Sequence, residues 1–332
     1  LGDVYKRQVE RNQQKLFAKA GSVIVLDGMF FHRSGFNNSN NRRRTCQGMY
    51  ALPFMGQQIC VPSTLKGKYQ EDPFLSELLN HVLQSKGKRI RPSVALLIAL
   101  SQKNNEDNVE QMATAVELLH IATLVHDDTV DDSEMRRGKF TVHKLWGQNT
   151  AILLGDFIFS SAAALVSQTD NVSVMHRFSQ PAIELSRGAL NETEEAFKPQ
   201  TKEQYLYRIY NKTASVFATI AESAAVLSDL PDEQIKSLRS YGYNLGMAFQ
   251  IVDDILDFDG DSDELGKPVG ADLANGLLTL PAFVVIDQDD DDTLFQASFT
   301  NPHDDDALKA AVSRVQQPEV ISESYAIAHQ YS

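Results

Sequence analysis

The sequence predicts a mainly α-helical protein that carries a short β fragment at its N-terminal end. At 332 residues the chain is long enough for one large domain or two ordinary ones. After about residue 80, apolar residues recur at three- and four-residue spacing, which is typical of helices. Before that point β-branched and aromatic residues flank a turn rich in Asn, Ser and Gly, which is typical of strands.

The N-terminal part divides into two pieces. Residues 1–14 begin with LGDVYKRQ, which fits no element around it, and we expect a linker or an assembly scar there. Residues 15–79 contain the apolar runs GSVIVLDGMFF and MYALPF on either side of the Asn-rich turn, so a hairpin or two sheet strands are predicted. The remaining residues, 80–332, are predicted to form a helical domain.

Five apolar stretches carry the helical prediction. Each places apolar side chains on one face of a helix, and polar loops separate them. In the stretch at 150–166, Asp156 interrupts the apolar run, which is therefore shorter than a membrane span needs. We expect a buried helix there and no membrane span. The stretches are RPSVALLIAL (91–100), VEQMATAVELLHIATLV (109–125), TAILLGDFIFSSAAALV (150–166), KTASVFATIAESAAVL (212–227) and LRSYGYNLGMAFQIVDDILD (238–257).

Composition narrows the classes of function. The chain has 31 Lys and Arg against 44 Asp and Glu, and its formal net charge of −13 argues against a nucleic-acid-binding or anionic-membrane surface. Its two cysteines, Cys46 and Cys60, are too few for a disulfide framework. We therefore expect a reducing, cytoplasmic location.

Two acidic clusters share the pattern Asp-Asp-x-x-Asp, and each follows an apolar helical run. Because positions i and i+4 lie on one helical face, the carboxylates crowd together and repel, so one cluster alone is as readily a solvated acidic face as a site. The repetition favours divalent cations, and Mg²⁺ above all, because Mg²⁺ takes one or two carboxylates and bridges to substrate phosphates. The clusters are Asp127, Asp128 and Asp131, and Asp253, Asp254 and Asp257.

A calcium-binding loop is the competing interpretation of DGDSDELG. Its alternating aspartates, Asp259, Asp261 and Asp263, match the first ligands of an EF-hand. However, the sixth position is Glu264 where the loop needs Gly, and the twelfth is Gly270 where it needs Glu. The calcium interpretation therefore fails.

Several basic residues stand beside the acidic clusters. Taken singly, each is more often a surface residue whose alkyl stem packs on the protein. Together they predict a substrate set with two diphosphates, because helix starts favour anions and the Arg fork suits phosphate oxygens. Metal would neutralise one diphosphate, and direct contacts would hold the other. The residues are Lys88, Arg89, Arg91, Arg136, Arg137, Lys212 and Lys267.

In order and spacing, a series of motifs over residues 80–330 resembles the trans-polyprenyl diphosphate synthases, the class I head-to-tail prenyltransferases. The motifs are GKRIRP, ELLHIATLVHDDTVDDSEMRRG, LLGDFIFSSA, YNKTAS, GMAFQIVDDILDF and GKPVGADLANGLLTLP. The resemblance implies an all-α isoprenoid synthase helical bundle in which the two aspartate motifs face each other across a cavity. It also implies a homodimer.

The resemblance assigns roles to individual residues. Mg²⁺ on the allylic diphosphate would be held by both aspartate clusters. The catalytic set would be Asp127, Asp128, Asp131, Lys212, Asp253 and Asp254. His120 could instead be a structural residue of the core whose hydrogen bonds are made within the protein, and this alternative stays open beside its substrate role. Isopentenyl diphosphate would be bound by Lys88, Arg91, His120 and Arg137, and the allylic diphosphate by Arg136, Lys212, Thr213, Gln250 and Lys267.

The implied reaction is ionisation of the allylic diphosphate, attack by the double bond of isopentenyl diphosphate and loss of a proton. It needs no protein nucleophile. In this family the residues just before the first aspartate motif line the tunnel for the growing chain, and here they are Ala122 and Thr123. Neither is a large aromatic, so we expect a product longer than farnesyl, of the kind that serves as a quinone side-chain precursor.

The segment before residue 80 resembles the C-terminal end of a phytanoyl-CoA-type iron and 2-oxoglutarate dioxygenase. His32 would be its distal iron ligand and Arg43 would pair with the co-substrate carboxylate, but the His-x-Asp pair that supplies the other ligands is missing. We expect no iron binding. The chain thus looks like two partial sequences joined, with the prenyl synthase part trimmed at both ends.

Three alternatives remain beside an active synthase. The chain could be a non-catalytic partner subunit of a heteromeric prenyl synthase, although such subunits usually lose one aspartate motif. It could be an inactive fusion that carries a dioxygenase remnant. A class I terpene cyclase would share the metal clusters, but it would not need GKRIRP.

Overall fold

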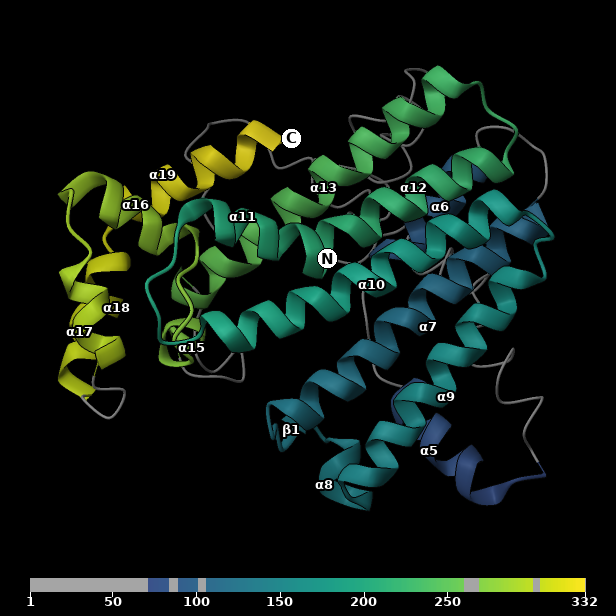
Figure 1. Cartoon of the computed structure of the whole chain (residues 1–332), viewed down its shortest axis with the longest axis horizontal. Coiled ribbons are helices and arrows are strands. Elements are labelled where there is room, and N and C mark those ends of the chain that lie inside the picture. The colour runs from purple at the N-terminus through teal and green to yellow at the C-terminus, as the bar shows by residue number, and fades with distance from the viewer. Residues whose placement is uncertain (1–70, 84–88, 101–105, 260–268, 301–304, 332) are drawn as a thin grey trace, which may run out of the picture.

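The computed structural model describes residues 71–83, 89–100, 106–259, 269–300 and 305–331. Over these ranges the chain is built of helices, apart from one short antiparallel hairpin (Figure 1). The prediction of a mainly α protein is confirmed. The N-terminal β prediction falls on residues that lie outside the described ranges, except at its C-terminal end.

The first half of the fold contains α5 (Pro73–Leu83), α6 (Ile90–Leu100), α7 (Glu106–Val130), β1 (Met135–Arg136), β2 (Lys139–Phe140), α8 (Val142–Trp146), α9 (Gln148–Ser167) and α10 (Val172–Glu195). The second half contains α11 (Lys202–Ile209), the π-helix η1 (Tyr210–Ala214), α12 (Ser215–Leu227), α13 (Asp232–Asp259), α15 (Ala271–Ala274), α16 (Leu280–Asp289), α17 (Thr293–Thr300), α18 (Asp305–Val315), α19 (Pro318–Ala328) and the 3₁₀ turn η2 (His329–Tyr331).

Helix α5 crosses the boundary that was expected at residue 80. Its residues 73–79, which were assigned to the β fragment, are helical, and Leu78 and Leu79 are buried in the same core as α6 and α7. The physical reason is the spacing of apolar residues in PFLSELLNHVL, which gives one face of a helix and no period-two alternation. The five helices predicted from the apolar stretches are all present.

Two hydrophobic cores hold the helices together. The first lies between α6, α7, α9 and α12 and is filled mainly by Leu, Val, Ile and Ala side chains such as Leu118, Ile158 and Ile220. The second lies among α11, the C-terminal half of α13 and helices α16 to α19, and its buried side chains include Phe283 and Phe295. Helix α13 contributes to both cores and so ties the C-terminal helices, at the left in Figure 1, to the rest.

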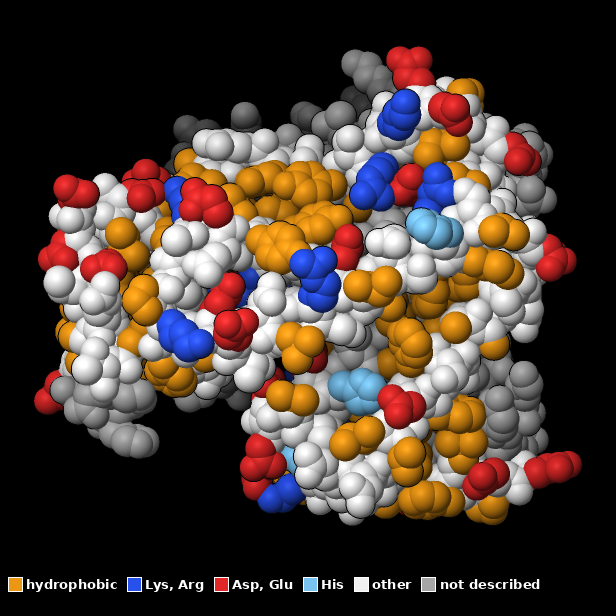
Figure 2. Space-filling view, viewed as in Figure 1, with side chains coloured by type: hydrophobic (Ala, Val, Ile, Leu, Met, Phe, Trp, Pro, Cys, Tyr) orange, Lys and Arg blue, Asp and Glu red, His pale blue; other side chains and the backbone are white. Residues whose placement is uncertain are grey.

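Helix α9 has one buried and one exposed apolar face. It continues through Asp156, whose exposed side chain does not interrupt it, and Ile158 and Ala162 pack against α7. On the other face Leu153 is 67% exposed, and hydrophobic side chains gather over this helix in Figure 2. By length and composition alone α9 would be apolar enough to cross a membrane, but part of it is buried inside this fold.

Helix α13 packs closely against η1 and α12, because α13 has glycine where the backbones meet. A Cβ on Gly242 would lie 2.4 Å from the carbonyl oxygen of Phe217, and one on Gly246 would lie 2.5 Å from the Cα of Ala214. These contacts are with backbone, which cannot move aside as a flexible side chain can. The two glycines therefore set the distance between the helices.

We expect Gly242→Ala to lower the free energy of unfolding by about 1–3 kcal/mol, because overpacking the contact outweighs the better helix propensity of alanine. Urea denaturation followed by far-UV circular dichroism measures the change. The matched control is Ser240→Ala on the exposed side of the same helix, which should stay within about 0.5 kcal/mol of wild type. An unchanged midpoint for Gly242→Ala would mean that α12 and α13 do not pack this closely.

Candidate active site

A cavity of about 760 Å³ lies between α6, α7, α10, η1, α12, α13 and α15. One part of its wall is acidic, one part is basic and the rest is apolar. The apolar part includes Leu124, Leu185, Val216, Leu245 and Phe249. Such a cavity can hold a ligand that has both a charged end and a hydrocarbon end.

The first acidic cluster lies in the last turn of α7 and just after it. Asp127 and Asp131 line the cavity, whereas Asp128 is buried and accepts a hydrogen bond from Arg136 Nε at 2.6 Å. Burial raises the pKa of Asp127 to about 6, with Lys212 opposing the shift and Asp131 adding to it. Burial likewise raises the pKa of Asp131. These two carboxylates thus hold negative charge that the protein compensates only in part.

The second acidic cluster lies near the C-terminal end of α13. Asp253 and Asp254 line the cavity from α13, and Asp253 is the more exposed of the two. Burial, with the neighbouring Asp272, raises the pKa of Asp254 well above its ordinary value, although Gln250 and Tyr205 donate hydrogen bonds to it. Two aspartates of each cluster therefore line the same cavity.

Asp257, the third aspartate of that cluster, lies off the cavity wall. Its carboxylate accepts the backbone N–H of Asp272 at 3.2 Å, and its carbonyl accepts the N–H of Gly270 at 2.9 Å. Gly270 adopts a left-handed conformation with φ of 73°, which starts the short helix α15. Asp257 thereby holds the turn that brings the Asp272 side chain to the cavity.

Asp272 is a cavity residue that the sequence patterns missed. It lies in GADLANG, outside both Asp-Asp-x-x-Asp motifs, and only its position in GKPVGADL beside Lys267 marked the segment. A lone aspartate carries no spacing signal, so its placement depends on the fold of α15 against α13. It adds a carboxylate to the acidic wall next to Asp253 and Asp254.

Lys212 and Thr213 reach the cavity from a π-helical turn, Tyr210–Ala214, between α11 and α12. Turns of this kind occur often at functional sites because the extra residue changes the direction of nearby side chains. Lys212 Nζ is held by Glu192 of α10 at 2.9 and 3.0 Å. Burial acts to lower the pKa of Lys212, but Glu192, Asp127 and Asp272 raise it, so the ammonium stays charged.

A chain of hydrogen bonds joins this turn to the second acidic cluster. The Thr213 hydroxyl donates to Gln250 Oε1 at 2.6 Å, and Gln250 Nε2 donates to Asp254 Oδ1 at 2.8 Å. The fully buried Tyr205 donates from its hydroxyl to the other carboxylate oxygen of Asp254 at 2.8 Å. Both oxygens of Asp254 are thus fixed by neighbours from α11 and α13.

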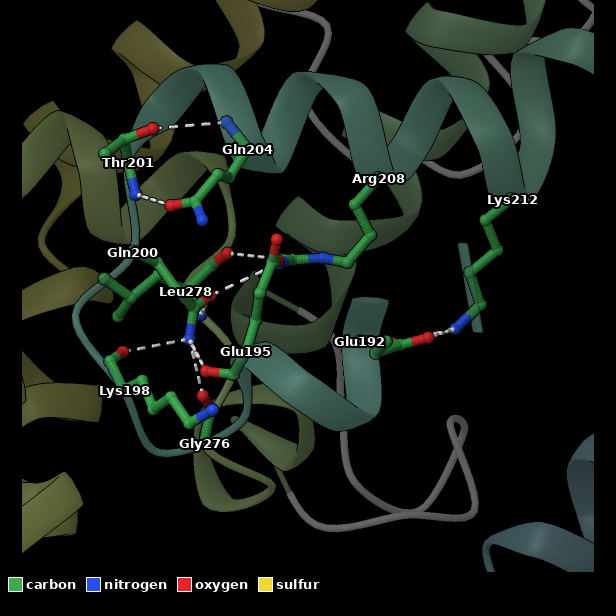
Figure 3. A network of polar contacts seen from close by, with 10 residues as sticks. All are labelled: Glu192, Glu195, Lys198, Gln200, Thr201, Gln204, Arg208, Lys212, Gly276 and Leu278. Atoms are coloured by element: carbon green, nitrogen blue, oxygen red, sulfur yellow. Dashed lines mark hydrogen bonds and ion pairs between the residues drawn. The ribbon is translucent and has the colours of Figure 1, made fainter. Parts of the chain in front are cut away.

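The segment between α10 and α11 is fixed by the buried side chain of Arg208 (Figure 3). Its guanidinium donates to Glu195 at 3.0 Å, to Gln200 Oε1 at 3.3 Å and to the carbonyl of Leu278 at 2.6 Å. Gln200 in turn donates to the carbonyl of Gly276 at 2.8 Å. This network ties α10 and α11 to the loop that follows α15.

The basic wall is formed by Arg91 of α6, the hairpin β1–β2 and His120 of α7. Arg91 lies with its guanidinium carbon 5.0 Å from the centre of the Phe217 ring, a cation–π distance. Burial lowers the pKa of His120 well below its ordinary value, and Arg91 and Arg137 lower it further, so this imidazole is neutral. Arg137 occupies the left-handed turn of the hairpin, with φ of 50°.

The remaining predicted residues divide by position. Thr123 lines the cavity, whereas Ala122 is 2% exposed and packs in the first hydrophobic core. One residue of rotation along α7 separates the two faces, which is why a sequence pattern could not choose between them. Arg89 also lines the cavity, where it pairs with Glu117. Lys88 and Lys267 lie outside the described residues, as do His32 and Arg43.

An all-α bundle whose cavity joins two facing sets of carboxylates, a basic wall and an apolar wall is that of an isoprenoid synthase. The Polyprenyl synthetase family model matches residues 72–315 of the chain. The chain belongs to this family and is a prenyltransferase.

Known proteins similar to the chain agree with this family. Heptaprenyl diphosphate synthase component 2 of Geobacillus stearothermophilus is 35% identical over 77% of the chain and 80% of its own length. Solanesyl-diphosphate synthase 2 of Oryza sativa subsp. japonica is 35% identical over 74% of the chain, and the match spans 62% of that protein. The crystal structure of heptaprenyl diphosphate synthase from Staphylococcus aureus superimposes with a TM-score of 0.76 at 32% identity, covering 84% of the chain and 89% of that structure.

Proposed function

We propose that the chain adds isopentenyl diphosphate head-to-tail to an allylic prenyl diphosphate, in a Mg²⁺-dependent synthesis of a trans-polyprenyl diphosphate longer than farnesyl. The observation that carries this proposal is the joint placement of Asp127, Asp131, Asp253 and Lys212 on one cavity whose other wall is apolar. The charged walls suit two diphosphates. The apolar wall suits the hydrocarbon chain.

The acidic wall fits Mg²⁺ by the chemistry of its donors. Mg²⁺ prefers oxygen ligands and binds through one or two carboxylates together with substrate phosphates. Within the described ranges no three His, Cys, Asp or Glu side chains are grouped closely enough to hold a metal by themselves, so diphosphate oxygens would complete the coordination. When bound, Mg²⁺ would supply positive charge that stabilises the leaving diphosphate.

The side chains of the cavity have separate tasks in this proposal. Lys212 binds oxygens of the allylic diphosphate and stabilises the charge that develops as the C–O bond breaks. Leu124, Leu185 and Phe249 surround the prenyl chain and keep water away from the allylic cation. Arg136 is already bound to Asp128, so it reaches phosphate as part of that ion pair.

Isopentenyl diphosphate would lie against the basic wall. Arg91 and Arg137 supply fixed positive charge, because guanidinium groups stay protonated and present several donors. The neutral imidazole of His120 can donate one hydrogen bond to a phosphate oxygen without adding charge. This arrangement holds the double bond beside the allylic carbon, and such positioning removes much of the entropic barrier.

We expect the purified chain to extend farnesyl or geranylgeranyl diphosphate with labelled isopentenyl diphosphate when Mg²⁺ is present, and to stop when EDTA removes the metal. Asp127→Asn should lower kcat by about 10²-fold, because it removes charge that holds the metal and diphosphate. Thin-layer chromatography of the dephosphorylated products measures both effects.

The matched control for Asp127→Asn is Asp132→Asn, five residues further along the chain, whose side chain is 97% exposed and should not affect turnover. Extension only after addition of a second subunit would favour a heteromeric synthase, a possibility supported by the similarity to a protein named as component 2 of its enzyme. No extension with or without a partner would contradict the proposal.

The length of the product is expected to depend on Thr123, because Thr123 faces the cavity four residues before Asp127. Thr123→Phe should shorten the main product, since a phenyl ring would fill space that the growing chain needs. Reversed-phase chromatography of the products gives the chain lengths. Thr123→Val, which keeps the volume, should leave them unchanged. An unchanged length in Thr123→Phe would mean that the chain grows in another direction.

Two further properties belong to the same proposal. The exposed apolar face of α9, with Ile152, Leu153 and Phe159, supports a homodimer, and light scattering of the purified chain would give its mass. A role in quinone synthesis would require the product length to equal that of the quinone side chain in the source cells, which mass spectrometry of the quinones can check.

A further inference from the structure

Glu192 and Glu195, three residues apart in the C-terminal turns of α10, each form an ion pair with a basic residue (Figure 3). The two ion pairs differ in their surroundings. The pair of Glu195 with Arg208 is buried, and the guanidinium is also bound to Gln200 and to the Leu278 carbonyl. In the pair of Glu192 with Lys212, Lys212 lines the cavity and its side chain is 47% exposed. The first pair is part of the framework, and the second can exchange partners.

Glu192 binds the Lys212 ammonium with both carboxylate oxygens, at 2.9 and 3.0 Å. Both hydrogen bonds that the structure shows for this ammonium go to Glu192, although other carboxylates lie near it. Asp127 and Asp131 line the same cavity as Lys212 and interact electrostatically with both Lys212 and Glu192. Asp272 adds a further negative charge on the side of α15. Glu192 is therefore a carboxylate that lies behind Lys212, beside the acidic wall, and that neither aspartate motif contains.

A diphosphate and Glu192 would both accept hydrogen bonds from the same Lys212 ammonium. Each offers anionic oxygens to a compact point charge, and the charge-assisted hydrogen bonds to one have to be broken before those to the other form. The exchange also brings negative charge towards Glu192, whose own charge then loses its partner. Both effects reduce the net free energy of binding a diphosphate.

We infer that Glu192 competes with diphosphate for Lys212, so that it weakens the hold of the site on the allylic substrate and on the diphosphate released at each addition. This inference rests on the proposed function. A synthase that makes several additions has to discharge one diphosphate per cycle. A resident carboxylate that takes Lys212 back favours that release. Glu192 is thus a residue that tunes affinity, and it touches Lys212 and not the reacting atoms.

The test is the affinity of the full chain for inorganic diphosphate in the presence of Mg²⁺, measured by isothermal titration calorimetry. Glu192→Gln keeps the shape and removes the charge, and it should bind diphosphate roughly three- to tenfold more tightly than wild type. In assays of chain extension it should also be inhibited by correspondingly lower diphosphate concentrations. Equal or weaker binding by Glu192→Gln overturns the inference.

Two further variants separate competition from a general change in charge. Glu194→Gln removes the same charge from an exposed position two residues along α10, and its affinity should equal that of wild type. Glu192→Asp keeps the charge but is one methylene too short to bind Lys212 in the same way, so it should also bind more tightly. Wild-type affinity in Glu192→Asp would mean that charge alone acts, and would overturn the competition. Thermal melting of each variant shows whether it is folded.

The outcomes also distinguish this inference from the proposed function. If the chain extends prenyl diphosphates and Glu192→Gln binds diphosphate no better, only the inference fails. If wild type and variant both fail to bind diphosphate with Mg²⁺, the proposed function fails and the inference fails with it.

Discussion

The close contact between α13 and the segment η1–α12 is the constraint on which the site depends. Gly242 and Gly246 remove two side chains where the backbones meet, and the helices approach until Phe217 and Ala214 touch α13. At this distance Gln250 of α13 accepts a hydrogen bond from Thr213 of η1, and within α13 it donates one to Asp254. Bulkier residues at the two glycines would force the helices apart, and the hydrogen bond from Thr213 to Gln250 would no longer span the gap.

The site also has to hold several carboxylates close together without their electrostatic repulsion destabilising the fold. Carboxylates that turn away from the cavity are each bound by a donor, as Asp128 is by Arg136 and Asp257 is by the backbone of Asp272. Asp127 and Asp131 face the cavity instead, where their negative charge stays available to a ligand. The repulsion between these carboxylates is therefore relieved when a cationic or metal-bound ligand binds, and this relief favours binding.

How much of this could be predicted from the sequence depends on the kind of signal. Helices with an apolar face, such as α7 and α13, were predicted because burial leaves a periodic pattern. Helix α10 was not predicted, because Pro181 lies inside it and apolar residues such as Ile183 and Leu190 lie on its exposed side, yet it carries Glu192 and Glu195. Local motifs located most of the cavity wall. They could not tell that Asp128 and Ala122 turn away from it, because neighbouring positions on a helix differ by about 100° of rotation and only packing decides which one faces inward.

The π-helical turn Tyr210–Ala214 directs Lys212 to the cavity, and it also changes which side of the helical segment faces each hydrophobic core. One additional residue in a turn rotates everything after it by about 100° relative to a regular α-helix. The segments before and after it form one continuous rod, but they present different sides to the protein. Before the turn, Tyr205 and Ile209 enter the core of the C-terminal helices, and after it Phe217 and Ile220 enter the core around α7. A single inserted residue thus allows one continuous helical segment to pack into two hydrophobic cores that lie on different sides of it.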